Sequence, residues 1–377
     1  MEPRCRHRAS LLRHEFLAAL ERHDCVGAHY GWLPRHLAAY GADGRLCGAV
    51  PLYLKDNSYG EFVFDWAWAD AYHRAGLPYY PKLVAAIPYT PVTGARILVA
   101  ADADRDAVAQ ALVDAALALT AAAGASSLHW LFTDPADTAL LVARGLLRRS
   151  SCHFHWHNRG YTSFDDFLAG LTSRKRKKIR RERRYVADAG IRMEILHGGE
   201  VTPAQWRVMH DFYRTTFEKK SGIPTLSLAF FEEIGRTMGD QVVLVLALHD
   251  QLPVAGAIML RSPTALYGRH WGCRADYHSL HFETCYYQGI EYAIRHGLEL
   301  FEPGAQGEHK ISRGFLPSYT WSAHWLRDER FRAAIAHYLN QEHTLMVAYH
   351  DDLQETSPYR TGDGDGGSGD GQAGGQQ

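Results

Sequence analysis

The chain has 377 residues, of which 46% are hydrophobic and 12% aromatic, enough to form more than one packed core. Its formal net charge of −1 excludes a protein whose whole surface is built to bind polyanions. Six cysteines lie far apart and form no CxxC pair, which predicts reduced thiols and argues against a disulfide framework.

The two ends of the chain bear on its location. Residues 1–25 lack the apolar stretch of a signal peptide, and no window of about 18 apolar residues predicts a membrane span. We therefore expect a cytoplasmic protein, or one bound peripherally at the inner membrane. Residues 361–377 are rich in glycine and contain no aromatic residue, so they cannot bury enough surface to offset their ordering entropy. We predict a disordered tail over 356–377.

Strand and helix patterns follow in the same order in two parts of the chain. Each part has two hairpin-like apolar runs, a long helix, a short buried strand, a short helix and a β-rich segment. The hairpin runs and the long helix fall at 46–54, 60–68 and 102–124 in the first part, and at 253–261, 265–273 and 281–297 in the second. This order predicts an α/β fold in which a mixed, largely antiparallel sheet flanked by helices is present twice.

An internal repeat supports this interpretation. Residues 128–156 align with 297–325 at a constant offset without a gap, and eight of the 29 positions are identical. The identities include Leu131-Phe132 with Leu300-Phe301, Arg144-Gly145 with Arg313-Gly314, and His155-Trp156 with His324-Trp325. We interpret the repeat as a duplication, with one domain in 1–157 and the other in 158–350.

The two copies differ at polar positions. Where the first copy has Thr133, Ala139, Leu140 and Leu141, the second has Glu302, Glu308, His309 and Lys310. Packing alone does not require a carboxylate, an imidazole and an ammonium where apolar side chains serve equally well. We therefore place the chemistry in the second copy. The alternative is a helix over 306–314 with a solvated charged face.

A strongly basic helix is predicted between the copies, over 172–189. Nine of the eleven residues in 174–184 are Lys or Arg. Cations in the first turns of a helix are unfavourable by a few tenths of a kcal/mol each, about 0.3 or more, and a bound phosphate would offset this. The phosphate-binding candidates are Arg174, Lys175, Lys177 and Lys178. The alternative is a solvated linker helix, and no motif supports sequence-specific DNA binding.

Three features together resemble the FemAB-like acyltransferases of the GNAT superfamily, a family of peptidoglycan biosynthesis or recognition. They are the basic helix SRKRKKIRRERRYVADAGI, the strand and loop LELFEPGAQGEHKISRGFLP, and the tandem copies. The similarity covers about 30–345. It implies two tandem GNAT-like domains and an N-acyltransferase that transfers an activated acyl or aminoacyl group to an amine on a cell-wall precursor.

The resemblance also implies the substrates. The donor would be acyl-CoA or aminoacyl-tRNA, which would make tRNA a partner, and the acceptor a small-molecule or lipid-linked precursor. GNAT enzymes that use acetyl-CoA usually carry an Arg/Gln-x-x-Gly-x-Gly/Ala loop that binds pyrophosphate. The nearest segment, RHWGCR at 269–274, ends in arginine and lacks the final small residue. This departure leaves the donor open.

Acyl transfer needs a base for the attacking amine, donors for the oxyanion and an acid for the leaving group. We expect Glu302, at the end of the repeated strand, to be the base or the amine anchor, with Glu308 and His309 as alternatives. Tyr286 is the candidate leaving-group acid, and a core aromatic is the competing interpretation. The residues expected to contact substrate are Gly304, Gln306, Gly307, Lys310, Arg313, His270 and Trp271.

Other segments are less specific. His153, His155 and His157 alternate along a strand, and we expect a solvated or paired strand face, because no further ligand has the spacing of a zinc site. No metal is predicted. Segments 79–83 and 88–94 are rich in proline and aromatic residues and would form one wall of a groove between the copies, or ordinary loops.

A competing function is a non-catalytic, degenerate GNAT pair that recognises a phosphate-bearing glycan precursor or RNA. The departure at 269–274 favours recognition, and the charged cluster at 302–313 favours catalysis. Convergence of Glu302, Glu308 and Lys310 on a cleft that reaches the basic helix would favour catalysis, and side chains that point into solvent would favour recognition.

Overall fold

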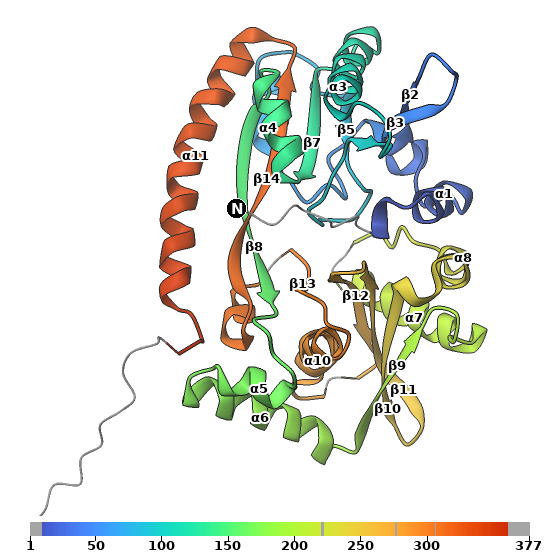
Figure 1. Ribbon diagram of the computed structural model, residues 1–377, viewed down its shortest axis with the longest axis vertical. Coiled ribbons are helices and arrows are strands. Elements are labelled where there is room, and N and C mark those ends of the chain that lie inside the picture. Colours follow the sequence, from blue (N-terminus) through green and yellow to red (C-terminus); the bar gives the residue numbers. More distant parts are fainter. Residues whose placement is uncertain (1–9, 220–221, 276, 306, 361–377) are drawn as a thin grey trace, which may run out of the picture.

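A computed structural model describes residues 10–219, 222–275, 277–305 and 307–360. One sheet of eleven strands runs through both halves of the molecule, and helices cover its faces (Figure 1). Its order is β1-β4-β5-β7-β14-β8-β13-β12-β11-β10-β9, and β2, β3 and β6 form a second, three-stranded sheet. The prediction of a mixed α/β fold flanked by helices is confirmed.

The large sheet contains β1 (Leu33–Pro34), β4 (Leu52–Lys55), β5 (Lys82–Ala85), β7 (Ser127–Thr133), β8 (Leu147–His157), β9 (Ile191–His197), β10 (Val242–His249), β11 (Leu252–Arg261), β12 (Ala265–Cys273), β13 (Leu300–Glu302) and β14 (Leu316–Leu326). The small sheet contains β2 (Leu37–Tyr40), β3 (Leu46–Val50) and β6 (Leu98–Val99).

The α-helices are α1 (His14–Arg22), α2 (Trp66–Arg74), α3 (Arg105–Ala122), α4 (Pro135–Ala143), α5 (Phe164–Ala169), α6 (Ser173–Asp188), α7 (Pro203–Glu218), α8 (Leu228–Met238), α9 (Leu280–Phe282), α10 (Gln288–Arg295) and α11 (Glu329–Glu355). Short 3₁₀ helices are η1 (Ser10–Leu12), η2 (Ala28–Tyr30), η3 (Gly239–Gln241) and η5 (Glu308–Arg313), and η4 (Glu283–Tyr287) is a π-helical turn. None of the helices in the described part of the chain is both long and apolar enough to cross a membrane.

The second half shows how the sequence pattern builds the core. Strand β10 has the continuous apolar sequence VVLVLALH, and only its last residue is not buried. Alternate side chains of a strand point to opposite faces, so Leu244 packs in the cluster formed with α7 and α8. Val243 and Val245 pack in the opposite cluster, with Ile290 of α10. Helices on both faces explain why this strand lacks polar alternation.

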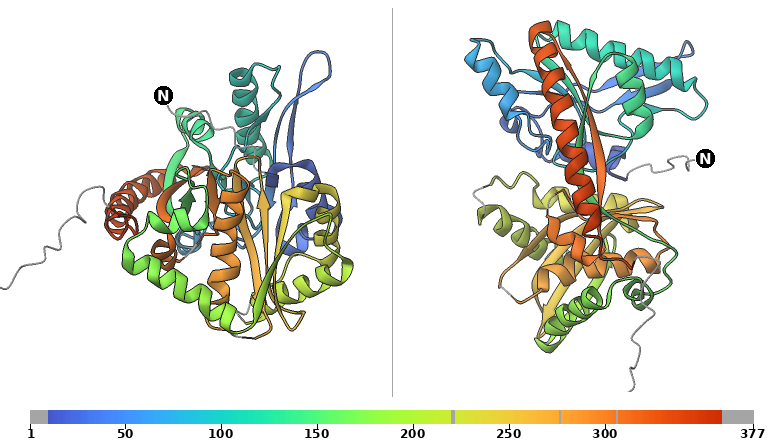
Figure 2. Two further views of the ribbon diagram at one scale, coloured as in Figure 1. Left: turned by 60° about the horizontal axis from the view of Figure 1, so that its bottom comes forward. Right: turned by 90° about the vertical axis from the view of Figure 1, so that its left-hand side faces the viewer.

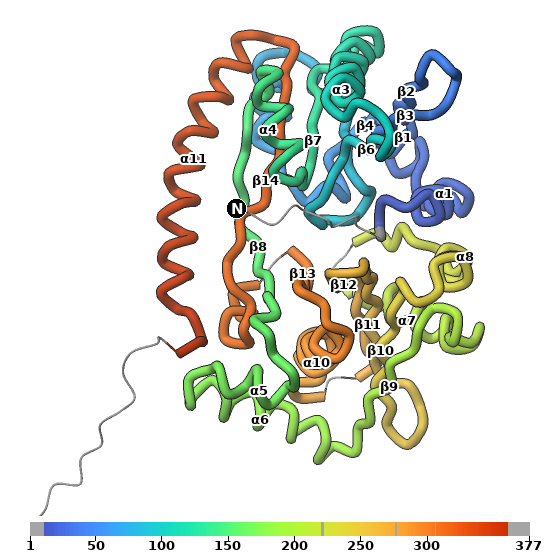
Figure 3. The backbone as a smooth tube through the Cα atoms, viewed as in Figure 1, coloured from blue at the N-terminus to red at the C-terminus, as the bar shows by residue number. Residues whose placement is uncertain are grey.

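The two halves exchange strands. β8 and β14 begin and end at equivalent positions of the repeat, and they pair antiparallel along nearly their whole length, with Ser151 opposite Thr320 at the centre. β14 also pairs with β7 of the first half, while β8 pairs with β13 of the second. The tube in Figure 3 shows β8 and β14 running side by side through the middle of the molecule.

Helix α11 covers this exchange. It packs on β14 and β8 and extends alongside both halves, as the right-hand view of Figure 2 shows. The boundary predicted between residues 157 and 158 falls where β8 ends, but β14 and α11 return to the first half. Strands of the two copies therefore pair across that boundary.

Three local predictions need correction. The strand expected at 60–68 is a loop followed by the start of α2. The helix expected over 306–314 is the 3₁₀ helix η5, although its counterpart α4 is an α-helix. Residues 356–360, assigned to the disordered tail, belong to the folded part, where Tyr359 is buried and donates a hydrogen bond to the Gly314 carbonyl. Residues 361–377 lie outside the described residues.

Candidate active site

Strands β12 and β13 separate in the middle of the second half. They pair in parallel only from Ala265 with Leu300 to Tyr267 with Glu302. Beyond that point β12 continues beside β11, whereas the other chain leaves through Pro303 and Gly304. A Cβ at Gly268 would lie 3.2 Å from the Pro303 backbone, so only glycine fits comfortably where the strands part.

The separation opens a cavity of about 450 Å³. Four residues predicted to form the site, His270, Trp271, Tyr286 and Gly304, lie on its wall. The ladder between β11 and β12 shifts register between Ile258 and Met259, which leaves Arg269 as a bulge beside the cavity. These residues belong to β12, η4 and the loop after β13, so three elements converge on one space.

The first half supplies a second wall. Phe62, Tyr89 and Pro91 line the same cavity, and Arg269 donates a hydrogen bond to the Tyr89 carbonyl. The expectation that 88–94 borders a groove between the copies is therefore confirmed. The expectation for 79–83 is wrong, because Lys82 is fully buried inside the first half. Phe62 was not predicted, because its segment was assigned to a strand.

Glu302 lies behind the cavity, buried to 5% exposure. Burial in a low-dielectric environment raises the pKa of its carboxyl to about 8. A backbone hydrogen bond from Thr93 and the positive charges of Arg96 and Arg269 act in the opposite direction but do not compensate. A carboxyl with such a pKa exchanges its proton near neutral pH, which suits a general base.

The sequence predicted a solvated or paired face for the histidines of β8, and the structure shows that most of this face is not solvated. His153 and His155 are buried, and only His157 is exposed. The Nε2 atom of His155 lies 3.7 Å from Oε2 of Glu302. Burial holds the pKa of His155 well below its usual value, so this contact joins a neutral ring to the carboxyl and is not an ion pair.

Lys310 is buried to 2% exposure. Its ammonium donates one hydrogen bond to the Gly304 carbonyl at 2.7 Å, and burial lowers its pKa to about 8. Cys285, on the cavity wall, is the one neighbouring group that opposes this shift. Lys310 thus places a positive charge immediately behind Gly304, where the first copy has the buried Leu141.

The remaining predicted catalytic residues diverge. His309 is exposed, and its Nε2 lies 3.0 Å from the Tyr286 hydroxyl. Burial raises the pKa of Tyr286. Glu308 points outward, where the Tyr349 hydroxyl of α11 donates to its Oε1 at 2.7 Å. Gly307 has a left-handed φ of 113°, and Gln306 lies outside the described residues.

Arg313 joins the loop to the basic helix. Its guanidinium is buried and donates to both carboxylate oxygens of Glu182, at 2.8 and 3.2 Å, and it lies over the Phe282 ring. Tyr287 also donates to Glu182. These bonds occupy the guanidinium that the sequence assigned to substrate. We assign it a positioning role, since it fixes α6 beside η5.

The basic helix forms α6 as predicted, with Thr172 at the N-cap and Gly190 in the left-handed conformation after its end. A concave surface of about 810 Å³ follows it and is lined only by cations: Arg174, Lys175, Lys177, Lys178, Arg180, Arg181 and Arg184. Burial, followed by the charges of Lys178 and Arg174, lowers the pKa of Lys175. The helix that carries this surface, α6, packs on η5.

In the described part of the first half, the corresponding space is closed. β5 and β7 pair in parallel from Leu83 with Leu128 to Ala85 with Trp130, as β12 and β13 do. Here, however, the chain leaving β5 returns, and Gly94 pairs with Thr133 at the end of β7. Arg96 fills the space, fully buried, and donates to the carbonyls of Val92, Gly94, Ala95 and Leu131.

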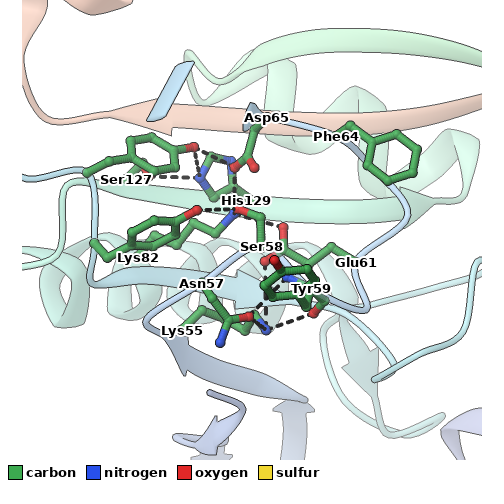
Figure 4. A network of polar contacts seen from close by, with 12 residues as sticks. Lys55, Asn57, Ser58, Tyr59, Glu61, Phe64, Asp65, Lys82, Ser127 and His129 are labelled. Atoms are coloured by element: carbon green, nitrogen blue, oxygen red, sulfur yellow. Dashed lines mark hydrogen bonds and ion pairs between the residues drawn. The ribbon is translucent and has the colours of Figure 1, made fainter. Parts of the chain in front are cut away.

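A buried ionic network surrounds Lys82 at the start of β5 (Figure 4). The Lys82 ammonium has no exposure and donates to Ser58 and Glu61, both at 2.8 Å, and to Asp65. Lys55 approaches Glu61 at 3.9 Å. The Lys82 and Lys55 ammonium groups thus both meet acceptors from their own half.

No group of three His, Cys, Asp or Glu side chains within the described ranges is arranged to hold a metal ion. The model of the FemAB-like family, described as peptidoglycan biosynthesis/recognition, matches residues 3–361. The chain belongs to the FemAB-like family. At family level, membership places it among proteins of peptidoglycan biosynthesis or recognition. No curated protein sequence matches this chain.

Solved structures share the fold of this FemAB-like protein. The crystal structure of FemX is 13% identical with a TM-score of 0.54, covering 87% of this chain and 94% of its own. The C-terminal domain (DUF2156) of a putative lysylphosphatidylglycerol synthetase from Agrobacterium fabrum is 11% identical with a TM-score of 0.51, covering 86% and 95%. At these identities the likeness shows the fold alone, and that fold is the one of FemX over most of both chains.

Proposed function

We propose that this FemAB-like protein is an N-acyltransferase that moves an activated acyl or aminoacyl group to an amine on a peptidoglycan precursor, at the cavity between β12 and β13. The observation that carries the proposal is the difference between the halves. The strands separate in both, but only in the second does the separation leave a cavity with a near-neutral carboxyl and a buried ammonium behind it.

Each step of the transfer has a candidate group. The Glu302 carboxylate takes a proton from the acceptor ammonium, and the free amine attacks the acyl carbonyl. Negative charge develops on the carbonyl oxygen, and the buried Lys310 ammonium supplies nearby positive charge in a low-dielectric environment. Tyr286, polarised by its hydrogen bond to His309, returns a proton to the leaving group as the tetrahedral intermediate collapses.

The basic surface along α6 is proposed to hold phosphates of the donor or the acceptor. Five of its cations, Arg174, Lys175, Lys177, Arg181 and Arg184, have no carboxylate partner among the residues that the structure describes. Of the two acids of the helix, Glu182 is already engaged by Arg313, and Asp188 is its last residue. A bound polyanion would relieve the mutual repulsion of these cations, and its affinity would fall as salt is added.

The experiment that tests the function offers acyl-CoA and aminoacyl-tRNA separately as donors, with a UDP-linked muropeptide as acceptor, and detects the acylated product by mass spectrometry. We expect product from one donor class with the wild-type protein, and a loss of at least about 100-fold with Glu302→Gln. Failure of both donors with a folded protein that still binds the precursor would contradict the transferase.

The basic surface is tested by calorimetry with CoA thioesters and dephospho-CoA, then with tRNA. Lys175→Ala/Lys177→Ala/Lys178→Ala is expected to weaken phosphate-dependent binding by at least about tenfold. The control Arg35→Ala/Arg45→Ala/Arg74→Ala removes three exposed cations from the first half and should leave binding unchanged. Equal losses in both variants would show that only net charge matters.

One observation favours a recognition role as the second candidate. Glu308 points away from the cavity, so the three charged groups expected to converge do so only in part. Under this alternative the α6 surface would bind a pyrophosphate-bearing glycan precursor without turnover. The same assays separate the two functions, because recognition predicts binding to α6 and no product.

A further inference from the structure

Three buried polar side-chain atoms meet at the seam between the halves without a hydrogen-bond partner among the described residues. They are Oγ1 of Thr93, Nε2 of His155 and Oε2 of Glu302. Thr93 and His155 belong to the first half, and Glu302 belongs to the second. Buried polar groups are nearly always hydrogen-bonded, so a cluster of unpartnered ones at a candidate catalytic carboxyl calls for a functional explanation.

The strand register explains how two of these atoms come together. β13 pairs antiparallel with β8, with Leu300 opposite His157 and Phe301 opposite Trp156. The next position of the ladder places Glu302 opposite His155. Directly opposed residues project from the same face of a sheet, so the two side chains share one environment. The strand exchange therefore brings a first-half histidine to a second-half carboxyl.

The surrounding charges keep the histidine neutral. Burial first, then His153, His157 and Lys310, disfavour a second proton on His155, which holds its pKa well below the usual value. A neutral ring can accept a hydrogen bond on one nitrogen. The separation of 3.7 Å between Nε2 and Oε2 is longer than a hydrogen bond, and catalytic contacts of this kind often tighten only when substrate binds.

Two cations face the carboxyl from other elements. Arg96, in the loop just before β6, donates to backbone carbonyls. Arg269 on β12 donates to the Tyr89 carbonyl and to Thr90. Neither lies within ion-pair distance of Glu302 among the contacts of the described residues. They favour the ionised carboxyl, but burial outweighs them. His155 and the Thr93 hydroxyl are thus the neighbouring groups able to accept a hydrogen bond from the protonated form, and His155 is the one at the ladder position opposite Glu302.

We propose that His155 is a positioning residue for Glu302: its Nε2 accepts a hydrogen bond from the protonated carboxyl and fixes the orientation of that carboxyl. The inference rests on the proposed function of Glu302 as the base. When the carboxylate takes the proton of the acceptor ammonium, the new O–H donates to Nε2. The proton stays on the carboxyl oxygen until it is released, so His155 never becomes charged.

This arrangement sets the pH at which the base works. A hydrogen bond to the neutral form of an acid favours that form and raises its pKa. Loss of the acceptor should therefore make Glu302 ionise at lower pH. Replacement by leucine removes the acceptor in a site that is already buried, and replacement by glutamine keeps an acceptor oxygen at a similar distance from the backbone.

The test compares His155→Leu, His155→Gln and the control His153→Leu in protein labelled with [5-¹³C]glutamate. The Glu302 carboxyl signal is assigned by its disappearance in Glu302→Gln, and its chemical shift is followed with pH. We expect its midpoint to fall by about one pH unit, a tenfold change in ionisation, in His155→Leu. His155→Gln should restore most of the shift. His153→Leu, two residues along β8 and next to Phe132, should leave it unchanged.

The NMR readout does not depend on turnover. An unchanged midpoint in both His155 variants, or an equal fall in His153→Leu, would overturn the proposal. If the midpoint moves as expected but Glu302→Gln remains active, the His155 contact stands and the assignment of Glu302 as the base fails. In an active enzyme, the limb of the kcat/KM profile set by the base should move with the NMR midpoint in His155→Leu.

Discussion

The two halves of the molecule begin from the same strand geometry and end in opposite states. In the first half, the space where β5 and β7 part is closed by returning chain and by Arg96. In the second half, the space where β12 and β13 part remains a cavity of about 450 Å³. The comparison shows that the fold does not itself create a site. The halves differ in whether other parts of the chain fill the space between the two separating strands.

The halves also differ in how the charge of a buried lysine is compensated. Lys82 in the first half meets two carboxylates and a hydroxyl, whereas Lys310 in the second donates a single hydrogen bond to a carbonyl. A compensated buried ion holds structure together, and an uncompensated one is costly unless a ligand or transition state uses it. The variants below test this division of roles.

The largest effect on stability is expected from Lys82→Met. Removing this ammonium leaves Glu61 and Asp65 buried without their main cation, which should lower the free energy of unfolding by about 3–5 kcal/mol. Guanidinium titration monitored by tryptophan fluorescence measures it. Arg74→Ala breaks an exposed pair with Asp70 in the same half and should lose at most about 1 kcal/mol. Similar losses in both would show that the network is not structural.

The second largest effect is expected from Glu302→Gln, which should show that activity depends on the second half. We expect kcat/KM to fall by at least about 100-fold, equivalent to about 2.7 kcal/mol, because the amide cannot take the amine proton. Glu308→Gln, a matched change at a side chain that faces Tyr349, should stay within about threefold of wild type. A reversed order of the two variants would move the base to Glu308.

The pH dependence of stability gives a smaller effect that needs no substrate. The pKa of Glu302 is about 8 in the folded protein, against a usual value of 4.5, so the folded state keeps a proton that the unfolded state releases. Between those values the free energy of unfolding should fall by about 1.4 kcal/mol per pH unit from this group. Glu302→Gln should remove that slope when urea midpoints are compared at pH 5.5 and 7.5. Parallel slopes would place the raised pKa elsewhere.

The smallest effect is expected on substrate binding, from the first-half residues that line the cavity. Phe62 lines the cavity, whereas Phe64, two residues on, points away from the network and is 54% exposed. Phe62→Ala should raise the KM of one substrate roughly fivefold, about 1 kcal/mol, with little change in kcat. Phe64→Ala should change neither constant. If both variants behave alike, the wall contributes no binding energy.

Part of this organisation follows directly from the sequence. The aligned identities Leu131-Phe132 and Leu300-Phe301 lie on corresponding buried strands, and the repeat offset matches the ends of β8 and β14. The basic helix was also predictable, because its cations, its cap at Thr172 and its end before Gly190 are local signals. The departure of Glu302 and Lys310 from their first-copy counterparts indicated where buried charge would lie.

Other features depend on tertiary contacts that no local pattern contains. The alternation in 60–66 resembles a strand, yet Glu61 and Asp65 point inward to Lys82 while Phe64 and Trp66 are exposed. Lys82, whose ammonium binds these two carboxylates, lies about twenty residues further along the chain, so no local pattern reveals their inward orientation. For His155 we expected a solvated or paired face. Its burial could not be predicted locally, because β13, which pairs with β8, comes from the other half.

The most direct test of the account is hydrogen exchange of the full chain with and without whichever donor supports product formation. We expect new protection in the second half, at β12, η4 and the segment around Gly304 and Lys310, and none where β5 and β7 part. Protection confined to 82–97 and 127–137 would contradict the account, because it would place the donor in the half whose opening is filled.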